Sequence, residues 1–421
     1  MSDTGLVDRG RGGLFEWWRA ADSRAHRAFV AAAFGWMLDA FDVMLYSMVV
    51  AALIQDPELH LSFRAAGILN SVTLIAGALG GIVFGIVADR FGRKRALMTS
   101  VLLYSLFTGA CGFARTAVEL AMFRIGLGLG MGGEWASGAA LVSESFPAQH
   151  RGKALGFMQS AWAIGYGAAA FVNLLVMPRW GWRGVFFVGV LPALLTVWVQ
   201  RSVEEPEIWR VRAAAGQKAG RFGDLFTAGL AGVTVALTLM NACTLFAWWG
   251  LNSWVPAYLR LPPAQGGVGL ASSTMSMFVI LMQVGMWFGY VTFGFIADAI
   301  GRRRAYVTYL LAASVLLPTY GALRNPPLLL ALGPFVAFFG TGYFSGFGAL
   351  TAEIYPTAIR ATAQGFTYNL GRIASAAAPY TVGSLAASSG FAPAFAVTGA
   401  VFLLGALAWI WIPETRGAEL R

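Results

Sequence analysis

Long apolar stretches separated by short polar segments run along almost the whole chain. They lie near residues 29–54, 66–88, 97–114, 117–142, 152–177, 184–200, 228–258, 271–297, 305–323, 328–351, 361–387 and 391–412. A bilayer core of about 30 Å is crossed by a helix of about 20 predominantly apolar residues, so each stretch can make one crossing. The pattern therefore predicts an all-α membrane protein with twelve transmembrane helices.

The composition supports this interpretation. Of 421 residues, 57% are hydrophobic and 12% are charged, and that charged fraction is about half of the value in an ordinary soluble domain. The net charge of +10 would suggest nucleic-acid binding in a soluble protein. Here the basic residues stand in short clusters between apolar stretches, as they do in cytoplasmic loops. We therefore expect both termini in the cytoplasm and no nucleic-acid partner.

The sequence contains no recognisable motif for a cofactor, a metal ion or a catalytic site. Cys111 and Cys243 fall in apolar stretches, so we interpret them as packing residues rather than as a disulfide. There is neither a phosphate-binding loop nor a Cys/His metal motif. The first apolar stretch is too long for a signal peptide and is predicted to remain as the first span. An enzyme and an ATP-driven pump are both disfavoured.

The chain contains an internal repeat. Residues 85–95 read Gly-Ile-Val-Ala-Asp-Arg-Phe-Gly-Arg-Lys-Arg, and residues 294–304, which lie 209 positions later, read Gly-Phe-Ile-Ala-Asp-Ala-Ile-Gly-Arg-Arg-Arg. At the same spacing Glu144, Pro147, Arg151 and Gly156 match Glu353, Pro356, Arg360 and Gly365. The repeat predicts a cytoplasmic tail, a six-helix bundle, a cytoplasmic interdomain loop, a second six-helix bundle and a second cytoplasmic tail, at residues 1–28, 29–200, 201–227, 228–412 and 413–421.

The repeated Gly-x3-Asp-Arg-x-Gly-Arg-Lys pattern resembles the signature of the major facilitator superfamily, and the resemblance covers nearly the whole chain. Within that superfamily, residues 39–42 (Asp-Ala-Phe-Asp) and 132–134 (Gly-Gly-Glu) resemble proton-coupled symporters of organic acids: the sialate, aromatic-acid and metabolite:proton groups. Some of these relatives carry Glu at the first acidic position. The resemblance implies two pseudo-symmetric bundles that rock about a central site, in a monomer located in a bacterial inner membrane.

The resemblance also implies a gate at the cytoplasmic end of the bundles. Its predicted members are Gly85, Asp89, Arg90, Gly92, Arg93, Glu144 and Arg151, with Asp298, Arg302, Glu353 and Arg360 in the second half. Gly92 permits close approach of the backbone. Asp89 is expected to pair with Arg93, Arg151 or backbone donors and so to latch the halves. The alternative is that the arginines only enforce the topology.

Five charged residues fall inside predicted spans, where burial costs several kcal/mol on insertion scales: Asp39, Asp42, Arg124, Glu134 and Arg372. Asp39 and Asp42 are three residues apart and share one helix face near mid-membrane. Two carboxyl groups this close in a low dielectric resist simultaneous ionisation, so one can hold a proton at neutral pH. A static pair fixed by an arginine is the alternative.

The other two charges of the first half are candidates for proton coupling. Arg124 is predicted at the depth of Asp42, and we expect a salt bridge between them that forms and breaks as the aspartate titrates. A permanent bridge between the two spans is the alternative. Glu134 lies in the inner third of its span and is predicted to relay the proton, to latch the inner gate or to be purely structural.

Arg372 is the best candidate for binding an anionic substrate, because a guanidinium presents paired donors that fit a carboxylate. Asn369 shares its helix face. The alternative is a stabilising pair between Arg372 and an acid of the other half. The remaining cavity candidates are Tyr46, Gln159, Asn241 and Gln283, with the aromatic residues Tyr166, Trp248, Trp249, Trp287, Tyr343 and Tyr368, although single aromatic residues are also common as packing groups.

The predicted function is secondary active transport, in which a small organic anion crosses together with protons by alternating access. Lactate-like monocarboxylates, aromatic acids, sialic or sugar acids and larger carboxylates all remain open, and a single midplane arginine favours a monoanion. A proton antiporter that exports a drug or metabolite is the first alternative, but residues 156–165 lack the proline of its Gly-Pro motif. A non-transporting membrane sensor is the second, and would usually need an added soluble domain.

Overall fold

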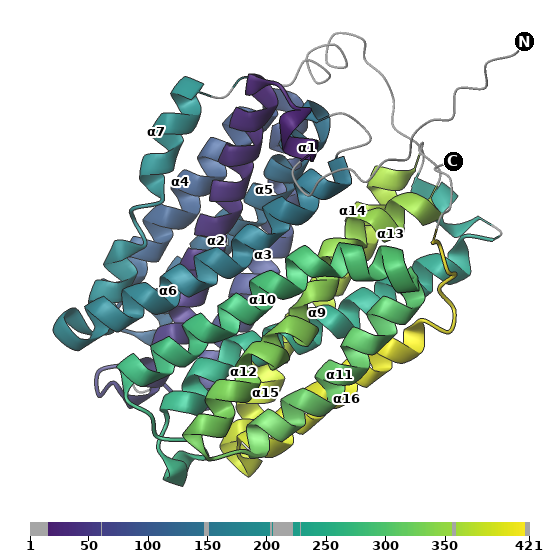
Figure 1. Cartoon of the computed structure of the whole chain (residues 1–421). Helices are drawn as coiled ribbons and strands as arrows, with labels where there is room; N and C mark the ends of the chain where they lie inside the picture. The colour runs from purple at the N-terminus through teal and green to yellow at the C-terminus, as the bar shows by residue number, and fades with distance from the viewer. Residues whose placement is uncertain are drawn as a thin grey trace, which may run out of the picture.

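The chain forms two bundles of helices packed side by side in this computed structural model (Figure 1). The structure describes residues 16–59, 61–146, 151–202, 204, 222–227, 229–355 and 359–416. The N-terminal bundle contains α1 (Glu16–Arg19), α2 (Ser23–Gln55), α3 (Phe63–Phe91), α4 (Arg93–Cys111), α5 (Ala117–Ser145), α6 (Arg151–Val188) and α7 (Ala193–Ser202). The C-terminal bundle contains η1 (Phe222–Phe226), α9 (Ala231–Arg260), η2 (Pro263–Gln265), α10 (Ser272–Ile300), α11 (Arg302–Ala322), α12 (Pro326–Thr341), η3 (Gly342–Gly346), α13 (Phe347–Ile354), α14 (Arg360–Ser375), α15 (Ala377–Ser389) and α16 (Phe391–Ala408).

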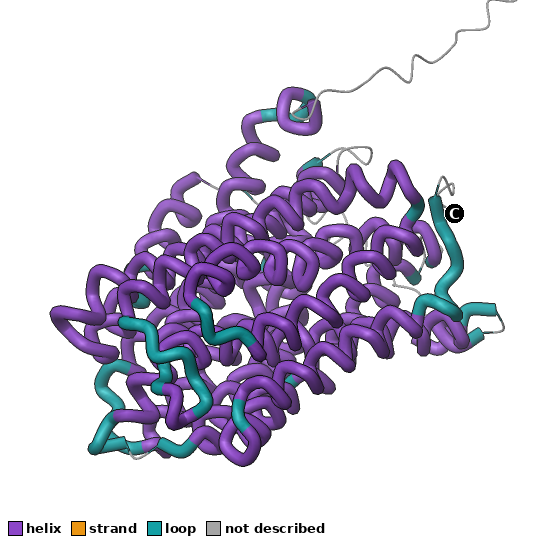
Figure 2. Tube along the Cα trace, turned by 60° about the horizontal axis from the view of Figure 1, so that its bottom comes forward, coloured by secondary structure: helices purple, strands orange, loops and turns teal. Residues whose placement is uncertain are grey.

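The predicted all-α class with twelve helical spans is confirmed. Each apolar stretch coincides with one helix or with two or three consecutive ones, and the described segments consist of helices and loops (Figure 2). Eight helical segments of the described chain are long and apolar enough to cross a membrane by themselves. Most of the predicted interdomain loop lies outside the described residues.

Two spans are less regular than the apolar pattern suggests. The stretch 361–387 is divided into α14 and α15 at Ala376. Pro379 explains the break, because it has no N–H to donate and its ring clashes with the carbonyl four residues earlier, on Ser375. In α6 the chain continues beyond the predicted end at residue 177 and turns at Gly181, whose φ is 62°. Proline and glycine thus set these bends locally.

The internal repeat is visible in the backbone. α3 ends at Gly92 with φ 106° and ψ 154°, and α10 ends at Gly301 with φ 101° and ψ 152°. A positive φ is readily adopted only by glycine. In both halves the next helix starts at the following residue, with the basic clusters 93–95 and 302–304. We call this side of the molecule the basic end, and the side with residues 56–62, 261–271 and 389–390 the opposite end.

Glycine contacts hold α3 and α5 unusually close. A Cβ atom on Gly80 would lie 2.1 Å from the carbonyl oxygen of Leu129, and one on Gly132 would lie 1.9 Å from that of Gly77. The glycines of the fourth apolar stretch, residues 117–142, therefore allow α5 to pack closely against α3. This packing positions Arg124 of α5 against α3.

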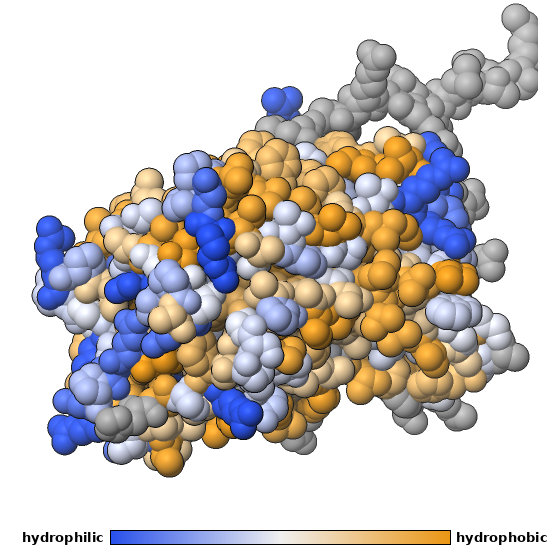
Figure 3. All heavy atoms as spheres, turned by 90° about the horizontal axis from the view of Figure 1, so that it is seen from below, coloured by the Kyte–Doolittle hydropathy of each residue, from blue (hydrophilic) through white to orange (hydrophobic). Residues whose placement is uncertain are grey.

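The surface is that of a protein surrounded by lipid. Hydrophobic atoms cover the middle of the face in Figure 3, and hydrophilic atoms gather toward its left and right margins. Large apolar side chains that are more than half exposed include Ile82, Leu106, Val315, Phe335 and Leu404. So much exposed apolar surface would be unfavourable in water, whereas it is compatible with the hydrocarbon core of a bilayer.

Candidate functional site

A small cavity lies between the two bundles. The N-terminal bundle contributes α2 and α6, and the C-terminal bundle contributes α9, α10, η3 and α14. The lining residues are Trp36, Gln159, Trp162, Leu245, Trp248, Trp249, Tyr290, Phe344, Tyr368 and Arg372. Its walls are thus mostly aromatic, and their polar groups are one guanidinium, one carboxamide, two tyrosine hydroxyls and the indole N–H groups of the tryptophans.

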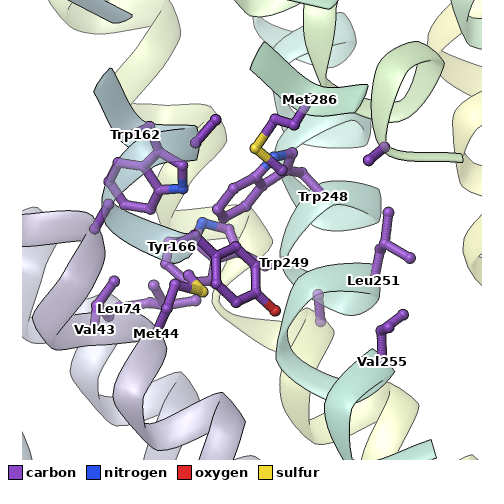
Figure 4. Close-up of a cluster of buried hydrophobic side chains, with 14 of the residues drawn as sticks. Val43, Met44, Leu74, Trp162, Tyr166, Trp248, Trp249, Leu251, Val255 and Met286 are labelled. Carbon is purple, nitrogen blue, oxygen red and sulfur yellow. The ribbon is translucent and has the colours of Figure 1, made fainter. Parts of the chain in front are cut away.

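At the cavity, Trp162 makes aromatic contacts across the bundle boundary. Its ring centroid is 5.5 Å from that of Trp248 and 6.5 Å from that of Trp249, both in edge-to-face geometry. The ring centroid of Trp36 on α2 lies 4.6 Å from that of Trp162. Figure 4 shows Trp162 of α6 facing the two tryptophans of α9. The cavity volume is about 30 Å³, which is room for one or two water molecules. A metabolite fits only when the bundles move.

Arg372 joins the C-terminal half to the N-terminal half at this cavity. It is 7% exposed, and its Nη2 atom lies 3.1 Å from the position that a Cβ on Gly77 of α3 would take. Asn369, on the same face of α14, reaches toward Gly81 of α3 in the same way, with its Oδ1 at 4.0 Å. The absence of side chains on these two glycines gives the polar groups of α14 room against α3.

Three carboxyl groups lie inside the N-terminal bundle. Asp39, Asp42 and Glu134 are each at most 1% exposed, and neither Asp42 nor Glu134 has a hydrogen-bond partner for its carboxyl oxygens. Asp39 interacts electrostatically with Arg372 across the bundle boundary and with Glu134 within its own bundle. The ion pairs of the described residues do not include an Asp39–Arg372 pair. An ionised carboxylate without partners is costly in such surroundings.

The ion pairs of the described residues do not include the predicted Asp42–Arg124 salt bridge, which is therefore not formed in this conformation. Arg124 is fully buried, and its Nη2 donates to Oδ1 of Asn70 at 2.9 Å while its Nε donates to the carbonyl oxygen of Leu69 at 3.3 Å. Its guanidinium carbon stands 3.7 Å above the ring of Tyr46. Arg124 was predicted at the depth of Asp42, but it lies at the depth of Tyr46, which is about one helical turn farther along α2.

Of the other residues predicted to bind substrate, one lines the cavity and three lie outside it. Gln159 lines the cavity. Tyr46 instead donates to the carbonyl oxygen of Ala66 at 2.8 Å. Asn241 packs against Gly371 of α14, and Gln283 lies beside Gly167 of α6, outside the cavity lining. Each of these two amides has one buried atom without a hydrogen-bond partner.

Several residues at the site were not singled out by the sequence. Trp36 and Trp162 line the cavity, and their positions offered a signal: one lies a turn before Asp39 and the other a turn after Gln159. Tyr104 of α4 is fully buried and interacts electrostatically with Asp39, Asp42 and Glu134. No spacing in α4 indicates this role, because the contact depends on how the helices pack.

The predicted gate is described in the C-terminal half. Arg302 forms an ion pair with Asp298 one turn earlier and another with Glu353 of α13, at 3.0 Å between Nη2 and Oε1. In the N-terminal half Gly92 forms the turn and Arg93 makes side-chain interactions. The side chains of the other predicted members lie outside the described residues: Gly85, Asp89, Arg90, Glu144, Arg151 and Arg360.

The bundles are closed against each other toward the opposite end. Asn70 of α3 donates to the hydroxyl of Ser253 at 2.7 Å. Asn173 of α6 donates to the hydroxyl of Ser276 at 2.9 Å. The ring of Phe63, at the start of α3, stacks on that of Trp254 of α9, with centroids 5.9 Å apart. These contacts join the two bundles on this side of the cavity.

Comparisons with known proteins agree with this architecture. Residues 32–291 and 261–421 match the model of the Major Facilitator Superfamily. A protein of Cupriavidus pinatubonensis named as a probable 4-methylmuconolactone transporter is 32% identical, over 97% of this chain and 95% of its own length. The cis,cis-muconate transport protein of Acinetobacter baylyi is 31% identical, over 92% and 94%.

Among solved structures, the xylose transporter XylE of E. coli in a partially occluded inward-open conformation superposes with a TM-score of 0.76. It covers 95% of this chain and all of its own, at 21% identity, and therefore shows the fold alone. The family match, the relatives and the two-bundle structure lead to one conclusion. The chain belongs to the Major Facilitator Superfamily and is a multi-pass membrane transporter, not an enzyme.

Proposed function

We propose that this transporter is a proton-coupled symporter that imports a small organic anion. The observation that carries the proposal is a single guanidinium, that of Arg372, at an aromatic-walled cavity between the bundles. A guanidinium binds a carboxylate through paired charge-assisted hydrogen bonds. Both bundles contribute to the cavity, so a ligand held there contacts both and is released when they rock apart. One chain supplies the complete cavity, which fits a monomer.

The lining favours a flat, unsaturated or aromatic monocarboxylate. Indole and phenol rings stack on planar π-systems, and Gln159 offers a hydrogen bond to a second polar substituent. Two relatives are named for 4-methylmuconolactone, an unsaturated monocarboxylate, and for cis,cis-muconate, an unsaturated dicarboxylate. Both names support a planar unsaturated acid, and the first supports a single carboxylate.

The substrate assignment is tested by binding to the purified transporter. Arg372→Lys keeps the charge but loses the paired geometry, so affinity for benzoate-like acids should fall by roughly 10- to 100-fold, the value of a charge-assisted hydrogen bond. Arg260→Lys is the matched control, because Arg260 lies at the opposite end of the same bundle and outside the cavity lining. Unchanged affinity in Arg372→Lys would assign the anion to another group.

The proton is proposed to bind Asp39 or Asp42, with Glu134 as a relay toward the basic end. The buried carboxyl oxygens without partners support this assignment, because such groups are expensive to keep ionised. A loaded cavity holds the anion beside Arg372 and a neutral aspartic acid, whereas a half-loaded cavity holds an uncompensated charge in a low dielectric. The free-energy penalty on the half-loaded state couples the proton flux to the substrate flux.

We place the basic end in the cytoplasm of a bacterial cell, because Arg and Lys are concentrated in the loops at that end.

Coupling is tested in de-energised vesicles. Addition of substrate should alkalinise the outside medium, and a protonophore should abolish accumulation. Asp42→Asn should lose gradient-driven uptake and keep substrate exchange. Glu119→Gln, on the first turn of α5 and outside the cavity lining, should behave as wild type. Acidification of the medium would instead indicate antiport. Accumulation that does not depend on the pH gradient would exclude proton coupling. The absence of any flux across a panel of carboxylates would favour a non-transporting sensor.

A further inference from the structure

A buried chain of polar contacts crosses from one bundle to the other. The guanidinium of Arg124 covers the ring of Tyr46 and donates to Oδ1 of Asn70 at 2.9 Å. Nδ2 of Asn70 donates in turn to the hydroxyl of Ser253 on α9 at 2.7 Å. All four side chains are at most 4% exposed. The chain therefore connects a charge of the N-terminal bundle to the C-terminal bundle without water between them.

The chain lies between the cavity and the opposite end. Asn70, Arg124 and Ser253 are each seven residues from the opposite-end terminus of their helix, which is roughly 10 Å. Trp248 of the cavity is five residues deeper on α9, or roughly 7.5 Å. A ligand that enters from the opposite end must pass this level first.

Arg124 determines which way the Asn70 carboxamide points. A guanidinium has only donors, so it must face the amide oxygen, and the amide NH₂ group must then face Ser253. The charge of Arg124 also polarises the carboxamide and strengthens the bond that its NH₂ group donates. Nη1 of Arg124 has no partner, and the ion pairs of the described residues do not include this arginine. Its hold on Asn70 therefore does not compete with an acid in this conformation.

We propose that Asn70 is an interbundle latch residue through which Arg124 controls closure of the opposite end. With the guanidinium in place, the carboxamide is fixed as a donor toward Ser253 and the bundles stay closed. When Arg124 is removed or drawn elsewhere, the carboxamide can rotate and the bond across the boundary weakens. The inference rests on the alternating access of the proposed function, but on neither the proton nor the identity of the substrate.

A second interbundle pair provides the comparison. Nδ2 of Asn173 on α6 donates to the hydroxyl of Ser276 on α10 at 2.9 Å and, at 3.3 Å, to that of Ser272, which is the same amide-to-hydroxyl chemistry across the same boundary. Its Oδ1 has no hydrogen-bond partner, so no charge orients it. If every interbundle bond were equivalent, the two pairs would respond alike to substitution.

The test measures the distance across the opposite end by pulsed EPR, without substrate or gradient. Spin labels are placed at Pro57 and Ala387, both exposed, in a background with Cys111→Ala and Cys243→Ala. Asn70→Leu and Ser253→Ala should each raise the fraction of long distances roughly fivefold, the value of one hydrogen bond. The Ser253→Ala effect should nearly vanish in an Arg124→Gln background, and the Ser276→Ala effect should persist there.

Two results would overturn the latch. One is an unchanged distance distribution in Ser253→Ala, which is the mildest substitution and decides the matter if Asn70→Leu does not fold. The other is additivity of Ser253→Ala with Arg124→Gln, which would make Asn70 one bond among several with no link to the arginine. Loss of symport in vesicles would leave the EPR result untouched, so failure of the proposed function is distinguishable.

Discussion

At the scale of single residues, the site depends on where side chains are missing as much as on where they are charged. Arg372 reaches the N-terminal bundle because Gly77 and Gly81 of α3 leave space opposite it. A sequence pattern predicts a midplane arginine from its cost in lipid. It does not reveal which glycine on another helix faces that arginine, since this pairing arises only when the bundles pack.

The glycine opposite the arginine gives a direct prediction. Gly77→Ala would place a methyl group 3.1 Å from Nη2 of Arg372 and 3.1 Å from the terminal methyl of Met131. Both neighbours are side-chain ends and can shift by a few tenths of an ångström, so the fold should survive while the guanidinium moves. We expect several-fold weaker substrate binding at near-normal thermal stability. Gly156→Ala, where no atom lies within 4 Å, should bind normally, and equal binding by both variants would contradict this account.

At the scale of helices, connections at the two ends are held by side chains from elsewhere in the chain. α11 has no side-chain cap of its own at Gly301, and Glu414 supplies one by accepting from the N–H groups of Arg302 and Arg303 at 2.9 and 3.1 Å. Partial burial acts to raise the pKa of Glu414, but these hydrogen bonds outweigh it and hold the pKa below its ordinary value. No pattern in the sequence indicates that Glu414 caps a helix.

Asp56 has the equivalent role at the opposite end. It follows α2 and accepts from Trp182 Nε1 at 2.8 Å and from the N–H groups of Glu58 and Leu59. Partial burial acts to raise its pKa, but the bond from Trp182, the two N–H groups and the charge of Arg183 together lower it. A lowered pKa means that the folded state favours the carboxylate, so its stabilisation is present above the unfolded pKa of about 3.9. It is lost as pH falls through the folded value.

Thermal unfolding in detergent tests this at the element scale. Asp56→Asn should lower Tm at pH 7, because the amide cannot accept all these bonds and carries no charge. The difference from wild type should begin to shrink as pH falls below the unfolded pKa of about 3.9, and it should be lost below the lower pKa of the folded state, where the wild-type carboxylate is protonated in both states. Glu58→Gln removes only an exposed ion pair with Arg183 and should change Tm little. A pH-independent difference for Asp56→Asn would show that the charge plays no part.

At the scale of the whole molecule, the proposed alternating access requires the bundles to move as units. The contacts between them lie toward the opposite end, and the cavity between them is too small for a metabolite. Substrate exchange therefore needs a large rearrangement between the halves and little within each half. Glycine packing within the N-terminal half, such as that between α3 and α5, is too close to slide.

Cross-linking tests the rigid-body description. With the native cysteines replaced, Asn173→Cys with Ser276→Cys places thiols on both sides of the bundle boundary, and a short cleavable bifunctional reagent should stop transport until it is reduced. Phe113→Cys with Phe187→Cys lies within the N-terminal bundle, where the two rings are 4.8 Å apart. Cross-linking that pair should leave transport unchanged. Continued transport with the first pair linked would mean that the bundles need not separate there.

The sequence alone determined the class of the molecule: the apolar stretches, the 209-residue repeat and the buried charges of α2, α5 and α14 are linear features, and each follows from the cost of polar groups in lipid. The tertiary structure decided which of these charges meet. It placed Arg124 on Asn70 and Tyr46 instead of on Asp42, and it surrounded Arg372 with tryptophans from three helices. A position along one helix specifies depth and face to within about a turn, whereas a contact depends on the relative rotation and distance of two helices, and only packing sets these.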